Sequence, residues 1–450
     1  MSFADLRQFL SHLEERGELV RVREEVDPKF EIAGYIRKSS DTGGPAFLFE
    51  NVKGSTMPVV GGIFGHRRRA IMALDTTPDK AVEKFNVGIA SPVPTRRVTG
   101  GPCQEVVHRH EDAELTRLPI PTYSAKDCNP YITCGMVISQ DPETGTKNAS
   151  IYRMEMKDER RLGILCSAGH HLGMQLAKAE ARGQPLEVAI VVGVAPATLM
   201  ATQWEAPYGV DELTLAGALL GQPVEVVKCK TVDLEVPASA EIVIEGRILP
   251  GVREMEGPFG EYTGYYTDTS PKPVIQVTAI THRKDAIYQA LLTGVPTTEN
   301  HVIKMVPLEA SYYSMLKARF PGVKAVHFPG AGGAGLMAVV SMRQHIKYEA
   351  RSVMLAVQSA HRNKIVIVVD DDIDPYNLEQ VMWAVCTRAQ PDQDMVIIPR
   401  LAGGYLDPSS KERDANCSLG IDATRPFGQP FAEVATVPGL DKVPDPGLRG

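Results

Sequence analysis

Apolar and polar positions follow two patterns along the chain, helical spacing near the ends and strand-like runs in the middle. Residues 2–16 carry apolar side chains at helical spacing, at Phe3, Leu6, Phe9, Leu10 and Leu13. This pattern predicts an amphipathic opening helix with a capping box at Ser2 and Asp5 and an end at Gly17. Strand and helix patterns then alternate up to residues 90–102, "ASPVPTRRVTGGP", whose proline and glycine predict a linker.

Short apolar runs dominate from about residue 103 to residue 300. They are "CGMVISQD", "ASIYRMEM", "LEVAIVVGV", "EIVIEGRIL" and "PVIQVTAITH". Runs of this length predict buried strands. Two helices are predicted among them, one from about His170 to Arg182 and one from near Asp211.

Helix and strand patterns alternate again after residue 301. The segment "KIVIVVDDDIDPYNLEQVMWAV" predicts a strand, an acidic turn and a helix, with Asn377 as N-cap and Gln380 as its capping-box partner. The fold class predicted for the whole chain is therefore α/β, with a strand-rich middle. The end, "VPGLDKVPDPGLRG", predicts a flexible tail or an arm that lies on a neighbouring subunit.

Composition narrows the class of protein. The net charge is −7 and the only basic run is "HRRR" at 66–69, which predicts a solvated loop or a local anion contact rather than a nucleic-acid-binding face. Apolar runs such as "IVIVV" are far shorter than the ~20 residues of a membrane span. The 7 cysteines form no C-x-x-C motif and no apolar N-terminal segment precedes them, which predicts a reducing, cytoplasmic location.

A glycine-rich loop offers one route to chemistry. Gly330, Gly332 and Gly335 match the G-x-G-x-x-G spacing of a dinucleotide-binding loop. That motif requires a helix at its third glycine, whereas "LMAVVSM" follows here and predicts a strand. The pattern favours a hairpin or flexible loop, and a Rossmann-type NAD-dependent oxidoreductase remains the alternative.

An acidic cluster offers a second route. It comprises Asp370, Asp371, Asp372 and Asp374. Carboxylates bind hard cations, but acids are also favoured just before a helix N-terminus by the helix dipole. We favour the second, purely structural interpretation.

The segment "EMEGPFGEYTGYY" places Glu256 and Glu261 on either side of a Gly-Pro-Phe-Gly turn. Further polar residues stand out in the strand-rich middle, at Asn148, Arg153, His171 and Glu212. Each has an ordinary structural explanation when taken alone. Together, the Asn oxygen, His nitrogen and Glu oxygen form a mixed set that suits Mn²⁺ or Mg²⁺.

Five motifs in this order resemble the UbiD family of prenylated-FMN-dependent decarboxylases. They are "NASIYRM", "GHHLGMQ", "YGVDE", "EGPFGEYTGYY" and "VIVVDDDID" with "VMWAV". The likeness covers roughly residues 100–395. It implies an N-terminal α/β domain (1–100), a central split β-barrel that binds the flavin (101–300), a C-terminal α/β oligomerisation domain (301–430) and a tail (431–450).

The resemblance also implies the roles of individual residues. Asn148, His171 and Glu212 match the ligands of the Mn²⁺ that bridges the cofactor phosphate. Glu212 and the backbone oxygens of Ala201, Thr202 and Trp204 match the ligands of K⁺. Contacts to prenylated FMN fall to Asn148, Ser150, Ile151, Arg153, His170, His171, Thr202 and Glu212. His170 stands beside His171 and leaves the ligand open, although spacing from Asn148 favours His171. Arg343 and Lys347 are both candidates for the phosphate.

Arg153, Glu256 and Glu261 match the family's catalytic set. Loss of CO₂ from an aryl or vinyl carbon needs an electron sink, which the cofactor supplies. Arg153 paired with Glu256 would receive the carboxylate, and Glu261 would return the proton. A regular strand would direct residues 148 and 153 to opposite faces, so a bulge or strand end is expected between them.

The function implied is reversible, non-oxidative decarboxylation of a small aromatic or heteroaromatic acid. His301 falls where relatives present a residue to the substrate ring, although a polar loop histidine explains it almost equally well. A flavin prenyltransferase would supply the cofactor, and a homodimer or homohexamer is expected. The remaining alternative is a non-catalytic flavin-binding assembly protein.

Overall fold

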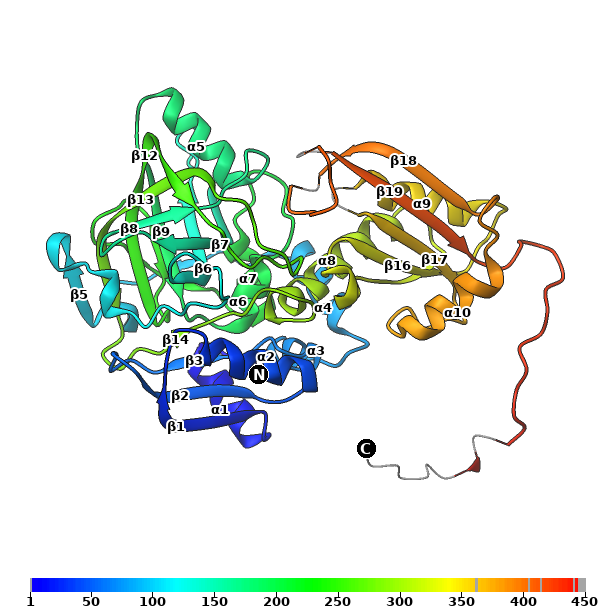
Figure 1. Ribbon diagram of the computed structural model, residues 1–450, viewed down its shortest axis with the longest axis horizontal. Helices are drawn as coiled ribbons and strands as arrows, with labels where there is room; N and C mark the ends of the chain where they lie inside the picture. Colours follow the sequence, from blue (N-terminus) through cyan, green and yellow to red (C-terminus); the bar gives the residue numbers. More distant parts are fainter. Residues whose placement is uncertain (1, 361–362, 404, 413–414, 440–441, 444–450) are drawn as a thin grey trace.

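The computed structural model describes residues 2–360, 363–403, 405–412, 415–439 and 442–443. Figure 1 shows three groups of elements: an N-terminal sheet with its helices, a central barrel, and a C-terminal sheet with its helices. The predicted α/β class with a β-barrel in the middle is confirmed.

The N-terminal sheet has the strand order β1-β2-β3-β14. Its strands are β1 (Leu19–Val26), β2 (Ala46–Val52), β3 (Val59–Gly61) and β14 (Tyr288–Gln289). The helices are α1 (Leu6–Glu15), α2 (Glu31–Thr42), α3 (Arg67–Ala73) and α4 (Ala81–Ala90). Helix α1 begins at Leu6 because the Asp5 carboxylate accepts the Gln8 N–H at 2.9 Å, so the predicted start at Ser2 was too early.

Six antiparallel strands close the central barrel in the order β12-β9-β6-β7-β8-β13, with β13 pairing back to β12. They are β6 (Tyr131–Gln140), β7 (Lys147–Met156), β8 (Arg161–Ile164), β9 (Leu186–Val192), β12 (Ile242–Glu256) and β13 (Ser270–His282). Ile190 and Ile244 belong to one apolar cluster, and Val191 and Val243 to another. Both faces of these strands are buried, which explains their continuous apolar runs.

Shorter elements surround the barrel. They are β5 (Val106–Arg109), α5 (His171–Ala181), α6 (Pro196–Ala201), α7 (Glu212–Leu220), β10 (Glu225–Lys228), β11 (Glu235–Pro237), and the 3-10 turns η1 (Pro102–Gln104), η2 (His110–Asp112) and η3 (Leu115–Arg117). Helices α5 and α7 begin near the predicted positions, whereas the six-residue α6 is too short to give a periodic pattern. The predicted linker contains β4 (Arg96–Arg97), which pairs with β10.

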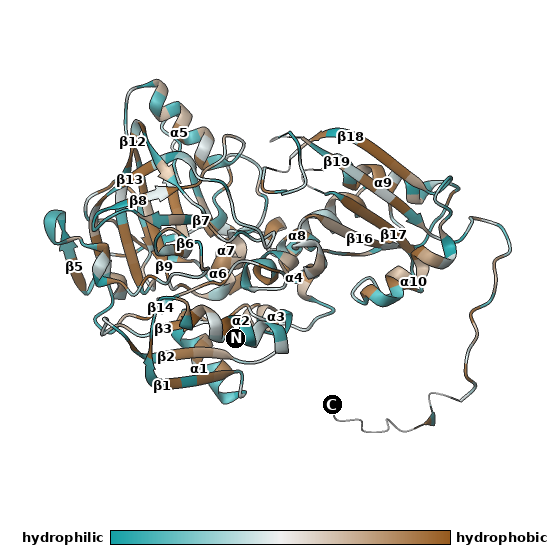
Figure 2. Cartoon of the chain, in the orientation of Figure 1, coloured by the Kyte–Doolittle hydropathy of each residue, from teal (hydrophilic) through white to brown (hydrophobic). Residues whose placement is uncertain are grey.

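The C-terminal sheet has the order β15-β16-β17-β19-β18. Its strands are β15 (Val323–His327), β16 (Met337–Met342), β17 (Ile365–Asp370), β18 (Met395–Ala402) and β19 (Ala415–Ala423), and its helices are α8 (Glu299–Lys317), α9 (Glu349–Ser359) and α10 (Leu378–Arg388). Figure 2 shows hydrophobic residues along β17, in agreement with the burial of Val366–Val369. Residues 431–439 of the predicted tail are exposed and contain no helix or strand, and 440–441 and 444–450 lie outside the described residues.

The glycine-rich loop is a hairpin connection. Residues Gly330–Gly332 form η4, and the strand β16 follows and pairs antiparallel with β15. A dinucleotide-binding loop requires a helix at Gly335, where the pyrophosphate would meet the helix N-terminus. The NAD-dependent alternative is therefore wrong.

The acidic cluster is structural, as favoured. Arg388 donates to Asp370 at 2.8 Å and to Asp372 at 2.9 Å, so the carboxylates are paired. Asn377 caps α10 as predicted, accepting the Gln380 N–H at 3.2 Å. The predicted reciprocal bond from Gln380 is wrong, because its side-chain oxygen accepts the Asp374 N–H.

The basic run at 66–69 is not a solvated loop, and its arginines contact carboxylate anions of the same chain. Arg67 makes two hydrogen bonds to the buried Glu309 of α8, at 2.8 and 2.5 Å. Arg69 is fully buried and donates to Glu18 at 2.9 Å. These ion pairs connect α3 to α8 and to the residue before β1. Among the residues that the structure describes, no helix has the length and apolar character needed to cross a bilayer.

Candidate active site

The strand β7 brings Arg153 against both acids of the "EMEGPFGEYTGYY" segment. Its guanidinium donates to Glu256 through Nε and Nη2, each at 3.0 Å, and to Glu261 through Nη1 at 2.8 Å. The side chains of Arg153, Glu256 and Glu261 are 7%, 0% and 12% exposed. Burial alone would lower the pKa of Arg153, but the two carboxylates raise it well above the ordinary value. The guanidinium is therefore a permanent cation.

Local structure sets this arrangement. Glu256 is the last residue of β12, and Gly257 adopts φ +93°, where an added Cβ would meet the Asp268 carbonyl oxygen at 3.1 Å. Phe259 is fully buried under the Arg153 guanidinium, which lies 5.2 Å from the ring centroid. The turn thus follows Glu256 directly and precedes Glu261, and the two acids bind different nitrogens of the guanidinium, Glu256 at Nε and Nη2 and Glu261 at Nη1.

Two further acids contact this turn, and sequence reasoning missed both. Glu155 accepts the Gly257 N–H at 3.1 Å, and Asp127 accepts the Gly260 N–H at 2.9 Å. Glu155 lies two positions after Arg153, so the period of a strand places both on one face. That spacing was the available signal for Glu155, whereas Asp127 lies in a loop with no comparable signal.

A second group of polar residues meets where β7 faces the start of α7. Glu212 accepts the Ala149 N–H at 2.7 Å, and its other oxygen lies 3.9 Å from Nδ1 of His171. The side-chain nitrogen of Asn148 is buried and has no hydrogen-bond partner. Burial raises the pKa of Glu212 to about 7 and lowers that of His171. The structure thus brings His171 and Glu212 together, beside the backbone N–H of Ala149, the residue that follows Asn148.

This group fits a divalent cation. A buried carboxylate without a cation is costly, and Asn oxygen, His nitrogen and Glu oxygen are ligands that Mn²⁺ accepts. In the part of the chain that the structure describes, no three His, Cys, Asp or Glu side chains cluster as a metal site, so the amide of Asn148 is needed to complete the set. Tyr208 packs edge-on against the His171 ring, with centroids 5.1 Å apart.

The predicted potassium segment follows the end of α6. Ala201 ends this helix, its carbonyl accepts the Trp204 N–H at 3.2 Å, and the Thr202 hydroxyl donates to Leu199 at 2.7 Å. The last carbonyls of a helix lack intrahelical partners and can ligate a cation. Helix α6 packs against α7, which carries Glu212.

The other predicted cofactor contacts occupy separate places. Ser150 and Ile151 are half-buried on β7, and the register between β6 and β7 shifts opposite Arg153, between Ile132 and Gly135. The irregularity is therefore on the partner strand. Arg343 and Lys347 follow the end of β16, and neither becomes preferred as the phosphate contact.

His301 is fully buried and uses both ring nitrogens within the chain. Nδ1 accepts the Thr298 N–H at 2.9 Å, which caps α8, so Nε2 carries the proton and donates to the Tyr262 carbonyl at 2.6 Å. Burial lowers the pKa of His301 to about 3, so the ring is neutral. The carbonyl that it contacts follows Glu261 directly.

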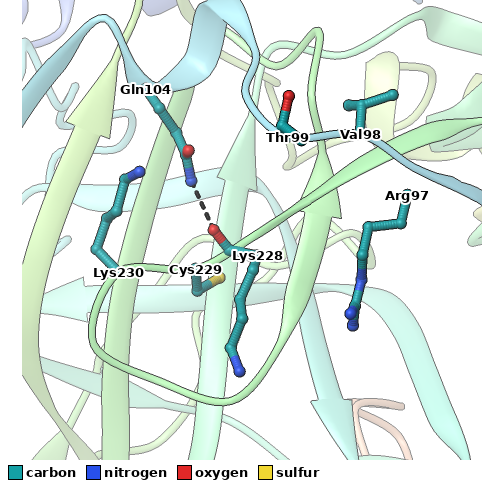
Figure 3. Close-up of a pocket in the computed structure, with 7 residues that line it drawn as sticks. All are labelled: Arg97, Val98, Thr99, Gln104, Lys228, Cys229 and Lys230. Atoms are coloured by element: carbon teal, nitrogen blue, oxygen red, sulfur yellow. Dashed lines mark hydrogen bonds between the residues drawn. The ribbon is translucent and has the colours of Figure 1, made fainter.

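The structure also has a cavity of about 510 Å³ away from these groups. Figure 3 shows its lining, which comprises Arg97, Val98, Thr99, Gln104, Lys228, Cys229 and Lys230. Arg97 pairs with Glu235, and Lys228 lies 2.8 Å from Asp233. This cavity contains none of the predicted site residues.

Comparison with known proteins identifies the fold. Three models of 3-octaprenyl-4-hydroxybenzoate carboxy-lyase domains match the chain: the N-terminal domain at 10–86, the Rift-related domain at 96–296 and the C-terminal domain at 301–423. The UbiD-class enzyme HmfF from Pelotomaculum thermopropionicum, solved with FMN, is 43% identical, with a TM-score of 0.92 and 98% of each chain covered. An evolved dimeric form of HmfF, solved with prFMN, is 42% identical, with a TM-score of 0.89, 98% of this chain and 99% of that one covered.

A third solved structure extends the comparison to another substrate. The vanillic acid decarboxylase of Sedimentibacter hydroxybenzoicus, in its closed form, is 34% identical, with a TM-score of 0.90 and 98% of each chain covered. The matched domain models and these similarities over nearly the whole length agree with the five motifs. The chain belongs to the UbiD family of carboxy-lyases.

Proposed function

We propose that this protein is a reversible, non-oxidative decarboxylase of a small aromatic or heteroaromatic acid that uses prenylated FMN. The observation that carries this proposal is the buried guanidinium of Arg153, which donates three hydrogen bonds to Glu256 and Glu261. A fixed cation in a site of low exposure is suited to bind a carboxylate and to orient it. The similar structure of a vanillic acid decarboxylase supports an aromatic acid as the substrate.

The chain's own residues divide the work. Arg153 receives the substrate carboxylate, and Glu256, which binds two of its nitrogens, keeps the guanidinium in place. Glu261 now accepts hydrogen bonds from Nη1 of Arg153 and from the Tyr262 N–H at 2.8 Å. A substrate carboxylate that takes over Nη1 releases Glu261 to carry the proton that replaces CO₂. Phe259 lines the cation with an apolar ring and excludes water.

The cofactor supplies the electron sink that an aryl or vinyl carbanion lacks. Asn148, His171 and Glu212 would hold Mn²⁺ on the cofactor phosphate, and Ala201, Thr202 and Trp204 would hold K⁺ beside Glu212 through their backbone oxygens. The buried carboxylate of Glu212 supports the Mn²⁺ assignment, because no Lys or Arg among the described residues pairs with it. Ser150, Ile151, His170 and Thr202 would contact the flavin.

The wider setting follows from this chemistry. A flavin prenyltransferase would supply the modified cofactor, the C-terminal domain would join subunits into a homodimer or homohexamer, and a cytoplasmic location suits seven free cysteines. The contact of His301 with the substrate stays a proposal. His301 would have to give up one of its two internal hydrogen bonds to contact the substrate. If it does contact the substrate, His301→Asn should change which acid the enzyme prefers.

Co-expression with a flavin prenyltransferase tests the function directly. The purified protein should contain prenylated FMN by mass spectrometry and should release CO₂ from at least one acid in a panel of hydroxybenzoic, furoic and pyrrole carboxylic acids. Product incubated with bicarbonate should regain the carboxylate. A protein that binds the cofactor but releases no CO₂ from any acid would instead support the non-catalytic flavin-binding alternative.

A further inference from the structure

The backbone N–H groups of the turn between the two catalytic acids donate to side chains from outside the turn. Residues 257–260 carry three backbone N–H groups, because Pro258 has none. Each of the three donates to a side chain: Gly257 to Glu155 at 3.1 Å, Phe259 to Thr267 at 3.2 Å and Gly260 to Asp127 at 2.9 Å. Backbone donors in a partly buried turn need partners, so these side chains help to fix the turn, together with the Thr267 N–H that donates to the Phe259 carbonyl at 3.0 Å.

The two outer partners are buried carboxylates. Glu155 is 1% exposed, and its charge is balanced by Lys157 at 2.7 Å and by the Asn129 amide at 2.6 Å. It lies beside Glu256, because a Cβ added at Gly163 would be 3.8 Å from the Glu155 Cβ and 3.6 Å from the Glu256 Cγ. Two ion pairs, Glu155 with Lys157 and Glu256 with Arg153, therefore lie next to each other.

Asp127 is 9% exposed and holds the other end of the turn. One oxygen accepts the Gly260 N–H, and the other accepts the Ser124 N–H at 2.8 Å and the Tyr123 N–H at 3.3 Å. The Gly260 carbonyl accepts the Thr293 hydroxyl at 2.6 Å. Gly260, the residue before Glu261, is therefore held at both its N–H and its carbonyl group, and both oxygens of Asp127 accept backbone N–H groups.

We propose that Asp127 and Glu155 are positioning residues, Asp127 fixing Glu261 and Glu155 fixing Glu256 against Arg153. The proposal rests on the decarboxylation proposed above. The hydrogen bonds are charge-assisted, which makes them stronger and more directional than neutral ones. Glu155 binds the N–H of Gly257, which directly follows Glu256, and Asp127 binds the N–H of Gly260, which directly precedes Glu261. The loss of either acid should therefore misplace one catalytic carboxylate and leave the other in place.

Crystal structures of Asp127→Ala and Glu155→Ala test this assignment without any need for activity. In Asp127→Ala, Glu261 should leave hydrogen-bond distance of Arg153 while Glu256 stays, and Glu155→Ala should give the converse. Turnover of the flavin-loaded Asp127→Ala variant should fall by about 10- to 100-fold, as expected for a misplaced group, with KM changed less than about threefold. Retention of both contacts to Arg153 in Asp127→Ala would overturn the proposal.

Glu245→Gln is the matched control. Glu245 is a fully buried carboxylate of the same strand as Glu256 and accepts two backbone N–H groups, from Lys230 at 2.7 Å and Thr231 at 2.5 Å, beside the cavity of Figure 3. This variant should lose thermal stability and keep the kcat of the loaded enzyme. A kcat loss equal to that of Asp127→Ala would indicate general loss of packing and would contradict a positioning role.

Thr293→Val provides a second variant in case Asp127→Ala does not fold. It removes only the donor to the Gly260 carbonyl, so Glu261 should shift less and kcat should fall by about 3- to 10-fold. An unchanged kcat and an unmoved Glu261 would count against the proposal. If the wild-type enzyme releases CO₂ from no acid while Glu261 moves as described, the positioning assignment stands and the proposed function fails.

Discussion

The two polar centres of this protein differ in how their charges are satisfied. Around Arg153, one cation meets two carboxylates at 2.8–3.0 Å, so the site is complete within the chain. Around Glu212, the buried carboxylate accepts backbone N–H groups and lies 3.9 Å from Nδ1 of His171, and no Lys or Arg among the described residues pairs with it. The first centre is preorganised by the fold, whereas the second has a buried carboxylate whose charge the Mn²⁺ proposed above would balance.

Arg153→Met should give the largest effect, because it breaks the complete centre. Glu256 would remain fully buried without its cation, and removal of one partner of a buried ion pair costs about 3–5 kcal/mol of unfolding free energy. Decarboxylation should fall by more than about 10⁴-fold, since the carboxylate loses its binding group as well. Urea unfolding and CO₂ release measure the two effects, and a variant of wild-type stability would show that Glu256 finds another partner.

Glu261→Gln should keep the first centre folded and remove its acid. The amide preserves an oxygen for Arg153 and for the Tyr262 N–H but cannot deliver a proton. Turnover should fall by ~10²- to 10⁴-fold, the range for loss of a general acid, while flavin absorbance stays unchanged. Full activity with normal deuterium incorporation from D₂O would assign the proton to another group.

The second centre should respond to pH where the first does not. The pKa of Glu212 is raised to about 7 by burial, so below that value a proton occupies the carboxyl that Mn²⁺ needs. Affinity for Mn²⁺ should therefore fall by about tenfold per pH unit as the pH drops below about 7. Calorimetry at pH 6 and pH 8 measures this, and Asn148→Ala or His171→Ala should release metal and flavin together. A pH-independent affinity would show that Glu212 is not a ligand.

Glu212→Gln should give the smallest effect. It should raise the free energy of unfolding, whereas Arg153→Met should lower it. A raised carboxyl pKa means that ionisation penalises the fold, with no penalty below the ordinary value of 4.5 and the full penalty above about 7. The metal-free variant should thus be more stable than the metal-free wild type at pH 8, by on the order of 1–3 kcal/mol, and equal to it at pH 4.5. Thermal unfolding of both proteins, each treated with a chelator, provides the comparison. Equal stability at pH 8 would mean that water or a chain donor already satisfies the carboxylate.

Local patterns and ordered motifs carried much of the interpretation. The starts of α5 and α7 and the cap at Asn377 all depend on residues close in the sequence. Such features are governed by backbone propensity, capping and side-chain period, which a single sequence displays. The solvated-loop alternative for residues 66–69 was wrong, because the pairing of Arg69 with Glu18 depends on contacts 51 positions apart.

The sequence by itself determined the fold class, the succession of strands and helices, and the identities of the polar residues available for chemistry. Only the tertiary structure decided that Arg153 meets Glu256 across 103 positions and that Asp127 reaches Gly260 across 133. Closure of the six-stranded barrel brings these residues together, since the pairing of β12 with both β9 and β13 fixes the position of Glu256 at the end of β12. Long-range register arises from the packing of the whole barrel, so no local pattern in the chain encodes it.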